Sequence, residues 1–376
     1  MSPWCTSQTN MPPRKPTALT RPPTKGDEAK ARYIRELSKK STPQEQLTFF
    51  QAFAAGTPSG YTQLVEFFDS IPKFFLTPQS SARNAEPLEI HRFQFRWGEH
   101  DWTATIAPVV VESRGSDGKT MRKDIMPGPR EETIYRALKK MAADPSAQRV
   151  IRETNVVLRF TLSQLRAELR EVGHEYKIWE LKEGLEVLNR SPLTITNTTQ
   201  NKKLYSGSYI ALQYFSDESD DSGTRSRVEV AFNELALAAI RAKLYYRIHY
   251  GRLLSLSPVG AWIYERLTRN FRQAGADHGY KLSLSAILRS GLRPRPDIRQ
   301  NVRQLRTVLN ELVEKEVLAM YPGAKEEVTY EPKTGKPGRP PIQEVVWTVW
   351  PHENVVRDIR TDNAAKLQQS ESLELS

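Results

Sequence analysis

Residues 281–321 read KLSLSAILRSGLRPRPDIRQNVRQLRTVLNELVEKEVLAMY, and this stretch decides how the rest of the chain is interpreted. Its apolar residues recur at helical spacing on both sides of a break formed by Gly291 and two prolines. Asp297 follows the prolines, and an aspartate in this place is typical of the residue that caps a second, longer helix. A short helix, a sharp turn and a longer helix predict a helix-turn-helix.

The charges of this stretch are distributed unevenly. Seven basic residues and a single acid lie between Lys281 and Arg306. Arginine donates paired hydrogen bonds to guanine in the major groove and to phosphate. We therefore expect contacts with DNA from Arg289, Arg293, Arg295, Arg299, Arg303 and Arg306. The alternative is a solvated basic helix face, although a face that only solvates the helix usually mixes both signs of charge.

The composition of the whole chain agrees with a polyanionic partner. Its 376 residues include 55 Lys and Arg against 44 Asp and Glu, a net charge of +11. Such an excess favours nucleic acid through counterion release. No apolar run approaches the roughly 18 residues of a transmembrane helix, so we expect no membrane partner. Cys5 is the single cysteine, which excludes an internal disulfide framework, and we expect a cytoplasmic protein without a signal peptide.

Changes in composition divide the chain into six segments. The expected order is a disordered basic proline-rich tail at 1–28, an N-terminal helical and β-hairpin extension at 29–130, a first winged helix at 131–216, an acidic linker at 217–226, a second winged helix at 227–351 and a polar C-terminal tail at 352–376. Both larger units show the order helix, strand, helix, helix, strand, strand. The expected fold is mainly α with small β-hairpins, an α+β fold built from tandem winged-helix domains.

The first expected winged helix differs from the second in its charge. Its third helix, Glu175–Asn189, has more acidic than basic residues, which favours contact with protein over base reading. The aromatic side chains of this helix belong either to the core or to the interface of a homodimer. A hairpin of Leu193–Thr196 and Tyr209–Phe215 is expected to follow. At its tip, Lys202 and Lys203 are expected to touch backbone phosphate, or else to be ordinary surface lysines.

The hairpin of the second expected winged helix has a basic loop, Lys333–Pro341, which reads KTGKPGRPP. An extended Gly-Arg-Pro segment can lie along a narrow A/T minor groove, where arginine gains from the concentrated negative potential. Short matches of this kind also occur by chance in basic loops. The basic residues assigned to this contact are Lys333, Lys336 and Arg339.

Four blocks of sequence carry a resemblance to a known family. They are PGPREETIYRALKKMA at 127–142, FTLSQLRAELR at 160–170, YKIWELKEGLEVLNRSPL at 176–193 and LLSLSPVGAWIYERL at 253–267. In these blocks and in its order of elements, the chain resembles the plasmid replication initiators with two tandem winged helices over residues 61–350. The resemblance implies a sequence-specific protein that binds repeated sites in double-stranded DNA at a plasmid origin, opens adjacent DNA and recruits the host replicative helicase and initiator proteins. It also implies a homodimer.

Motifs of enzymes are scarce. The sequence has no GxxxxGK[ST] phosphate loop, and its six histidines never pair at the close spacing that a metal-dependent nickase needs. We therefore expect a protein that is not an enzyme, with no catalytic residue, no metal and no cofactor. A winged-helix transcriptional regulator is the alternative function, and a recombinase or nickase is a more distant one. Directly repeated sites beside an A/T-rich stretch would favour initiation.

Overall fold

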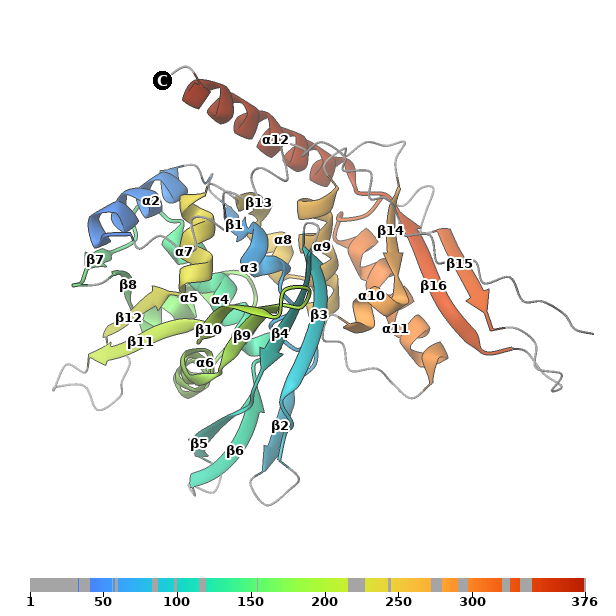
Figure 1. Ribbon diagram of the computed structural model, residues 1–376, viewed down its shortest axis with the longest axis horizontal. Helices are drawn as coiled ribbons and strands as arrows, with labels where there is room; N and C mark the ends of the chain where they lie inside the picture. Colours follow the sequence, from blue (N-terminus) through green and yellow to red (C-terminus); the bar gives the residue numbers. More distant parts are fainter. Residues whose placement is uncertain are drawn as a thin grey trace, which may run out of the picture.

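The computed structural model describes residues 33, 41–55, 57, 60–82, 87–97, 100–114, 120–153, 155–215, 227–242, 245–271, 279–289, 297–319, 325–331 and 340–374. Within these residues the strands form five antiparallel sheets, with helices between and around them (Figure 1). The chain is therefore an α+β protein. The prediction of a mainly α fold with small hairpins is wrong, since strands make up whole layers of the molecule.

The N-terminal part contains a four-stranded sheet in the order β10-β9-β4-β3. Its strands are β3 (His91–Trp97), β4 (His100–Ile106), β9 (Leu193–Asn197) and β10 (Lys202–Gly207). Along β3, β4 and β9, apolar and polar side chains mostly alternate, because one face packs on the core. Strand β9 pairs with β10 and β4, so the predicted hairpin of 193–196 with 209–215 is wrong.

A second four-stranded sheet has the order β11-β12-β8-β7. It consists of β7 (Arg149–Ile151), β8 (Val156–Thr161), β11 (Ile210–Phe215) and β12 (Arg227–Phe232). The linker predicted at 217–226 falls outside the described residues, and β12, which follows it, pairs with both β8 and β11. The domain boundaries stay predictions.

The expectation of tandem winged-helix domains is wrong. The five sheets do not divide into two repeated units, because β4 of the predicted extension pairs with β9, and β12 joins the sheet of β8 and β11. The physical reason is that alternation identifies a half-buried strand without identifying its partner. Two strands that looked like a closed hairpin are separated by a third strand and belong to different sheets.

The remaining elements of the N-terminal part complete two smaller sheets and their helices. Strand β1 (Tyr61–Val65) pairs with β13 (Tyr245–His249), and a three-stranded sheet contains β2 (Gln79–Ala82), β5 (Val109–Arg114) and β6 (Thr120–Met126). The helices are α2 (Pro43–Ala55), α3 (Glu66–Ser70), α4 (Pro129–Ala142), α5 (Leu162–Glu171), α6 (Ile178–Arg190), α7 (Glu234–Arg241) and α8 (Tyr250–Leu254).

The C-terminal part is built from consecutive elements. They are α9 (Pro258–Asn270), β14 (Tyr280–Ser283), α10 (Leu284–Arg289), α11 (Ile298–Glu314), β15 (Lys325–Tyr330) and β16 (Ile342–Val349), with a three-stranded sheet in the order β14-β16-β15. Both helices of the predicted helix-turn-helix are present, as α10 and α11, while residues 290–296 between them lie outside the described residues. The segment expected to be a polar tail forms α12 (Glu353–Glu374), which buries Val355 and Ile359 (Figure 1).

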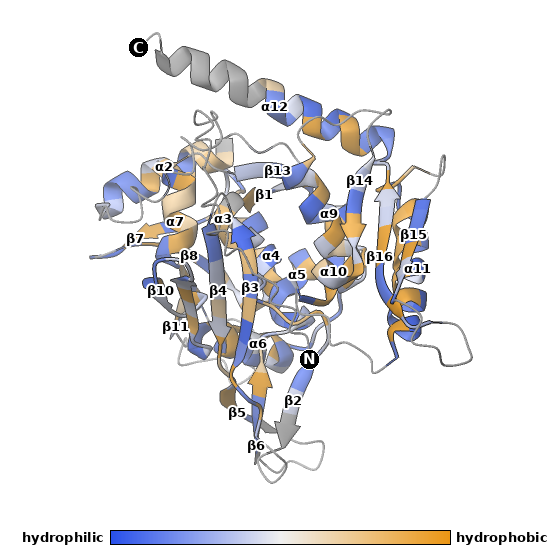
Figure 2. Cartoon of the chain, turned by 45° about the vertical axis from the view of Figure 1, so that its right-hand side comes forward, coloured by the Kyte–Doolittle hydropathy of each residue, from blue (hydrophilic) through white to orange (hydrophobic). Residues whose placement is uncertain are grey.

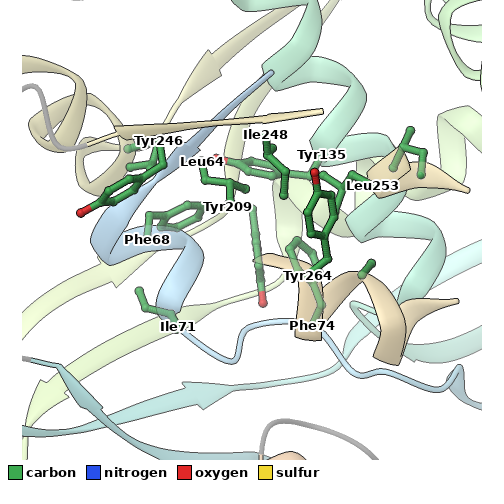
Figure 3. Packing of buried hydrophobic residues seen from close by; sticks show 14 of the residues in the cluster. Leu64, Phe68, Ile71, Phe74, Tyr135, Tyr209, Tyr246, Ile248, Leu253 and Tyr264 are labelled. Atoms are coloured by element: carbon green, nitrogen blue, oxygen red, sulfur yellow. The ribbon is translucent and has the colours of Figure 1, made fainter. Parts of the chain in front are cut away.

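One hydrophobic cluster joins most of the buried apolar residues, from Tyr33 to Ile359. Figure 3 shows its centre, where Tyr135 of α4 lies among side chains of several elements. The ring of Tyr135 is 5.5 Å from that of Phe68 and 5.9 Å from that of Phe232. Figure 2 colours α11 in both hydrophilic and hydrophobic shades, in agreement with a helix that has one face on this core and one in solvent.

Candidate nucleic-acid interface

Helix α11 has a capped start and one buried side. The Asp297 carboxylate accepts a hydrogen bond of 2.9 Å from the backbone N–H of Arg299, which satisfies one of the free donors at the helix start. The buried side packs against α9 and β16. It consists of Asn301, Val302, Leu305, Val308, Leu309 and Leu312. This packing fixes the direction in which the opposite side of the helix projects.

The opposite side of α11 is exposed and basic. Arg299 and Arg303 lie four residues apart on it, and neither guanidinium forms an ion pair with a described residue. A groove of about 600 Å³ runs beside this face. It is lined mainly by polar side chains, namely Ser257, Gln300, Arg303, Gln304, Thr307 and Glu311, with Val308. Arginine and glutamine are the side chains that pair with guanine and adenine edges, respectively.

Arg306 differs from the other arginines of the helix. Its Nε donates to Glu326 Oε2 at 2.9 Å and its Nη2 to Glu326 Oε1 at 2.6 Å. The indole Nε1 of Trp347 donates to the same carboxylate at 2.9 Å. The hydrogen bond from Arg306 is the main reason why the pKa of Glu326 lies below its usual value. Arg306 therefore ties α11 to β15 and β16, although its side chain is still 59% exposed.

The other predicted DNA-binding residues are distributed over several elements. Arg289 is exposed at the end of α10, and Lys202 and Lys203 are exposed on β10, in a different sheet from that beside α11. The structure thus brings together only the three arginines of α11 among those that it describes. The remaining predicted residues lie outside the described residues, and they are Arg293, Arg295, Lys333, Lys336 and Arg339.

Sequence reasoning missed the polar residues that share the face of α11 with the arginines. Gln300, Gln304 and Thr307 all border the groove. The spacing of these three residues in the sequence indicated a shared face, because positions i, i+4 and i+7 of a helix lie on one side. Glutamine is also a common helix residue, so the spacing alone did not distinguish a binding face from an ordinary one.

A separate group of charged residues is buried between α3, α4 and α9. Lys139 Nζ lies 2.7 Å from Asp69 Oδ2, and Lys73 Nζ lies 3.3 Å from Asp69 Oδ1. On the neighbouring turn of α4, Arg136 contacts both Glu132 and Glu265, each at 3.0 Å. Each base here has a carboxylate partner, so the group is an internal ion-pair network rather than a reactive site.

The charges of this network shift the acidities of its members. Burial opposes the charged form of Asp69, but the ammonium groups of Lys139 and Lys73 hold the pKa of Asp69 well below its usual range. Burial lowers the pKa of Lys73 to about 8, against the opposing attraction of Asp69. Within the described part of the chain, no group of three or more His, Cys, Asp or Glu side chains could hold a metal ion. None of the described helices is long and apolar enough to cross a membrane.

Comparison with known proteins gives a distant structural likeness. No protein-family model matches the chain, and no curated protein matches it. The crystal structure of selenomethionine derivatives of domains 2 and 3 of RctB is similar, with 10% identity and a TM-score of 0.44, over 77% of this chain and 98% of that one. A second structure of RctB domains 2–3 has 10% identity and a TM-score of 0.41, over 73% and 95% of the two chains. Likeness at this level carries no argument about function.

Proposed function

We propose that this chain is a DNA-binding initiator of plasmid replication, and that the exposed face of α11 contacts the major groove. The observation that carries the proposal is the asymmetry of α11. Its apolar side is buried, while Arg299 and Arg303 project from the opposite side without an ion-pair partner among the described residues. A helix anchored in this way presents its side chains to a groove at little cost in ordering.

The finer parts of the proposal come from the resemblance in sequence. They are binding to repeated sites at a plasmid origin, opening of the adjacent DNA, recruitment of the host helicase and formation of a homodimer, all without catalysis by this chain. One feature supports self-association. Trp179, at the start of α6, is 50% exposed, and exposed tryptophans are enriched in protein interfaces.

The contact with DNA can be tested with selected duplexes. A preferred sequence is first selected from random duplexes, and affinity is then measured at fixed salt on this sequence and on a scrambled one. We expect Arg299→Ala and Arg303→Ala each to weaken specific binding by about 1–3 kcal/mol. Arg170→Ala, at an exposed position on α5, is the matched control and leaves affinity unchanged. Unchanged affinity in both α11 variants would remove this helix from the interface.

The initiator role needs a second test, because a transcriptional regulator would bind DNA in the same way. Mapping of the bound sites should find direct repeats spaced by about two helical turns, beside an A/T-rich stretch that becomes reactive to single-strand probes when the protein binds. Binding at isolated operator-like sites, without opening of neighbouring DNA, would favour regulation instead.

A further inference from the structure

A second cationic surface lies on the sheet β10-β9-β4-β3, far from α11 in the sequence. The side chains on its inner face are mostly apolar and buried, whereas those on its outer face are polar and exposed or half-buried. The strand register arranges the outer face in three rows. They contain Arg92, Thr105, Thr194 and Ser206 in the first row, Gln94, Thr103, Thr196 and Lys203 in the second, and Arg96 and Asp101 in the third.

The middle of this face consists of hydroxyl groups. The Oγ1 atoms of Thr103 and Thr198 are 3.0 Å apart, and Thr194 Oγ1 lies 3.3 Å from Ser206 Oγ, so hydroxyls of neighbouring strands share one side of the sheet. The rows include no apolar side chain, and among the described residues no helix is drawn in front of β3 and β4 in Figure 1. Covering this face with another apolar element would not stabilise it, because it has no apolar side chains to bury.

The charged side chains lie at the two edges of the sheet. Arg92 and Arg96 are exposed on β3, Lys203 is exposed on β10, and none of the three forms an ion pair with a described residue. The single carboxylate of the rows, Asp101, is the register partner of Arg96. The face therefore has hydroxyl groups in its middle and cationic side chains at its edges, and this combination is complementary to phosphate.

The dimensions of the face match duplex DNA. Three strand spacings separate β3 from β10, which is about 14 Å. The major groove of B-form DNA is about 12 Å wide, so cations at opposite edges can reach phosphates on both sides of a groove while the hydroxyls lie between them. Single-stranded nucleic acid is usually bound on aromatic platforms, and the outer rows contain no aromatic residue.

We propose that this outer face, carried by Arg92, Arg96, Lys203 and the threonines between them, is a second DNA-contact surface that binds duplex phosphates without regard to sequence. The inference rests on the proposed function, because it assumes that the chain acts on DNA. The inference also goes beyond the proposed function, because it assigns a DNA contact to the N-terminal part of the chain and to residues outside the helix-turn-helix. The role of α11 is to read sequence, and the role of the sheet face is to hold the backbone.

The salt dependence of binding by the full-length protein tests this surface. The probe is a labelled mixed-sequence duplex about three helical turns long, titrated over a series of salt concentrations. The double variant Arg92→Ala/Arg96→Ala should reduce the slope of log affinity against log salt by about two, since each neutralised phosphate contributes about one. Arg92→Lys/Arg96→Lys should keep the slope. Arg170→Ala/Arg190→Ala, at exposed positions of α5 and α6, should also keep it.

Asp101 provides a test of the opposite sign. Because Asp101 is the register partner of Arg96 and places a negative charge on the proposed surface, Asp101→Asn should tighten binding and steepen the salt slope. A surface that does not touch DNA would give unchanged affinity in this variant. Thermal unfolding of each variant, compared with the wild-type protein, shows whether a loss of binding comes from a loss of fold.

The outcomes separate this inference from the proposed function. An unchanged slope in the Arg92/Arg96 double variant, with a loss in Arg299→Ala/Arg303→Ala, overturns the sheet surface and keeps α11. A reduced slope in the sheet variant with no loss in the α11 variant keeps the sheet surface and overturns the contact by α11. Binding to a single strand in preference to the duplex, or no binding of the wild-type protein to any duplex, overturns the sheet surface.

Discussion

The part of the chain from α9 to β16 and the part before it are held together in different ways. In the C-terminal part, β14 and β15 both pair with β16. Helices α10 and α11 lie between β14 and β15 in the sequence. In the N-terminal part, Tyr61 pairs with His249 and Trp102 with Asn197, so strands are joined across much of the sequence. The order of elements along the sequence was therefore enough to predict the helices and strands of the C-terminal part. In the N-terminal part it led to the wrong strand partners.

The two parts meet through polar contacts as well as through the common core. Arg136 of α4 binds Glu265 of α9, and Asp358 of α12 accepts hydrogen bonds from Arg252 at 3.5 Å and from the Tyr61 hydroxyl at 2.9 Å. Helix α12 thus returns from the C-terminal part to the β1–β13 pair. These contacts provide places where the comparison can be tested by substitution.

The largest effect is expected for Arg136→Ala, at the junction of the two parts. The substitution leaves the carboxylates of Glu132 and Glu265 in a buried site without the guanidinium that lies 3.0 Å from each. Removing one partner of a buried ion pair costs about 3–5 kcal/mol in unfolding free energy, measured by urea denaturation. Arg122→Ala, which breaks the exposed pair with Glu112, should cost less than about 1 kcal/mol. Equal losses in the two variants would contradict a junction held by buried charge.

A pH-dependent effect is expected for Lys73, in the same network. Burial lowers the pKa of its ammonium from 10.5 to about 8, so between these values the unfolded chain binds more protons than the folded chain. The free energy of unfolding contributed by Lys73 therefore rises as the pH increases through this window, by at most about 3 kcal/mol. Urea denaturation at several pH values should show that Lys73→Met lacks this rise. Parallel pH profiles for the variant and the wild-type protein would contradict the prediction.

The sequence predicted the C-terminal elements because their signals are local. Asp297 identified the start of α11, and the spacing of Val302, Leu305 and Leu309 identified its buried side. In the N-terminal part, the same reasoning found Leu193–Thr196 as a strand and then paired it with the wrong segment, since β4 and β10 are its partners. Strand partners depend on packing between distant residues, and a single sequence does not show that packing.

The candidate interface could be predicted only in part, for a similar reason. The arginine row of α11 follows from helical spacing, but the pairing of Arg306 with Glu326 requires β15 to lie beside the helix. The sequence indicated Lys203 as a phosphate contact but did not place it beside Arg92, because these two residues come to one face only through the pairing of β3, β4, β9 and β10. Arg92 carries no local signal that would distinguish it from other surface charges.

Arg303 and Arg306 should separate binding from stability within the C-terminal part. Arg303→Ala should weaken DNA binding by about 1–3 kcal/mol and leave the unfolding free energy unchanged. Arg306→Ala should have the smaller effect on DNA, because its guanidinium is held by Glu326, and should lower the unfolding free energy by up to about 1 kcal/mol. Affinity and urea denaturation are measured on both variants. A larger loss of DNA binding in Arg306→Ala would show that the ion pair opens when DNA binds.

Two helix starts, one in each part, provide a further comparison of stability. Asn233 caps α7 by accepting from the backbone N–H of Ala236 at 3.0 Å, and its Nδ2 also donates to the Tyr209 carbonyl at 3.1 Å. Asp297 caps α11 with a bond to Arg299 alone among the described residues. We expect a loss of about 2–3 kcal/mol for Asn233→Ala, because a buried carbonyl loses its donor, and about 1 kcal/mol for Asp297→Ala.

The two capping residues, Asn233 and Asp297, differ in how far their hydrogen bonds reach along the chain. The Asn233 side chain joins α7 to the start of β11 across the predicted linker, whereas the cap of α11 stays within its own first turn. Replacing each residue by serine restores a cap but not the amide donor. Asp297→Ser should therefore recover most of the lost stability, and Asn233→Ser should recover only part of it. Full recovery at both positions would show that the long-range bond of Asn233 adds nothing, and that both parts depend on local structure to the same degree.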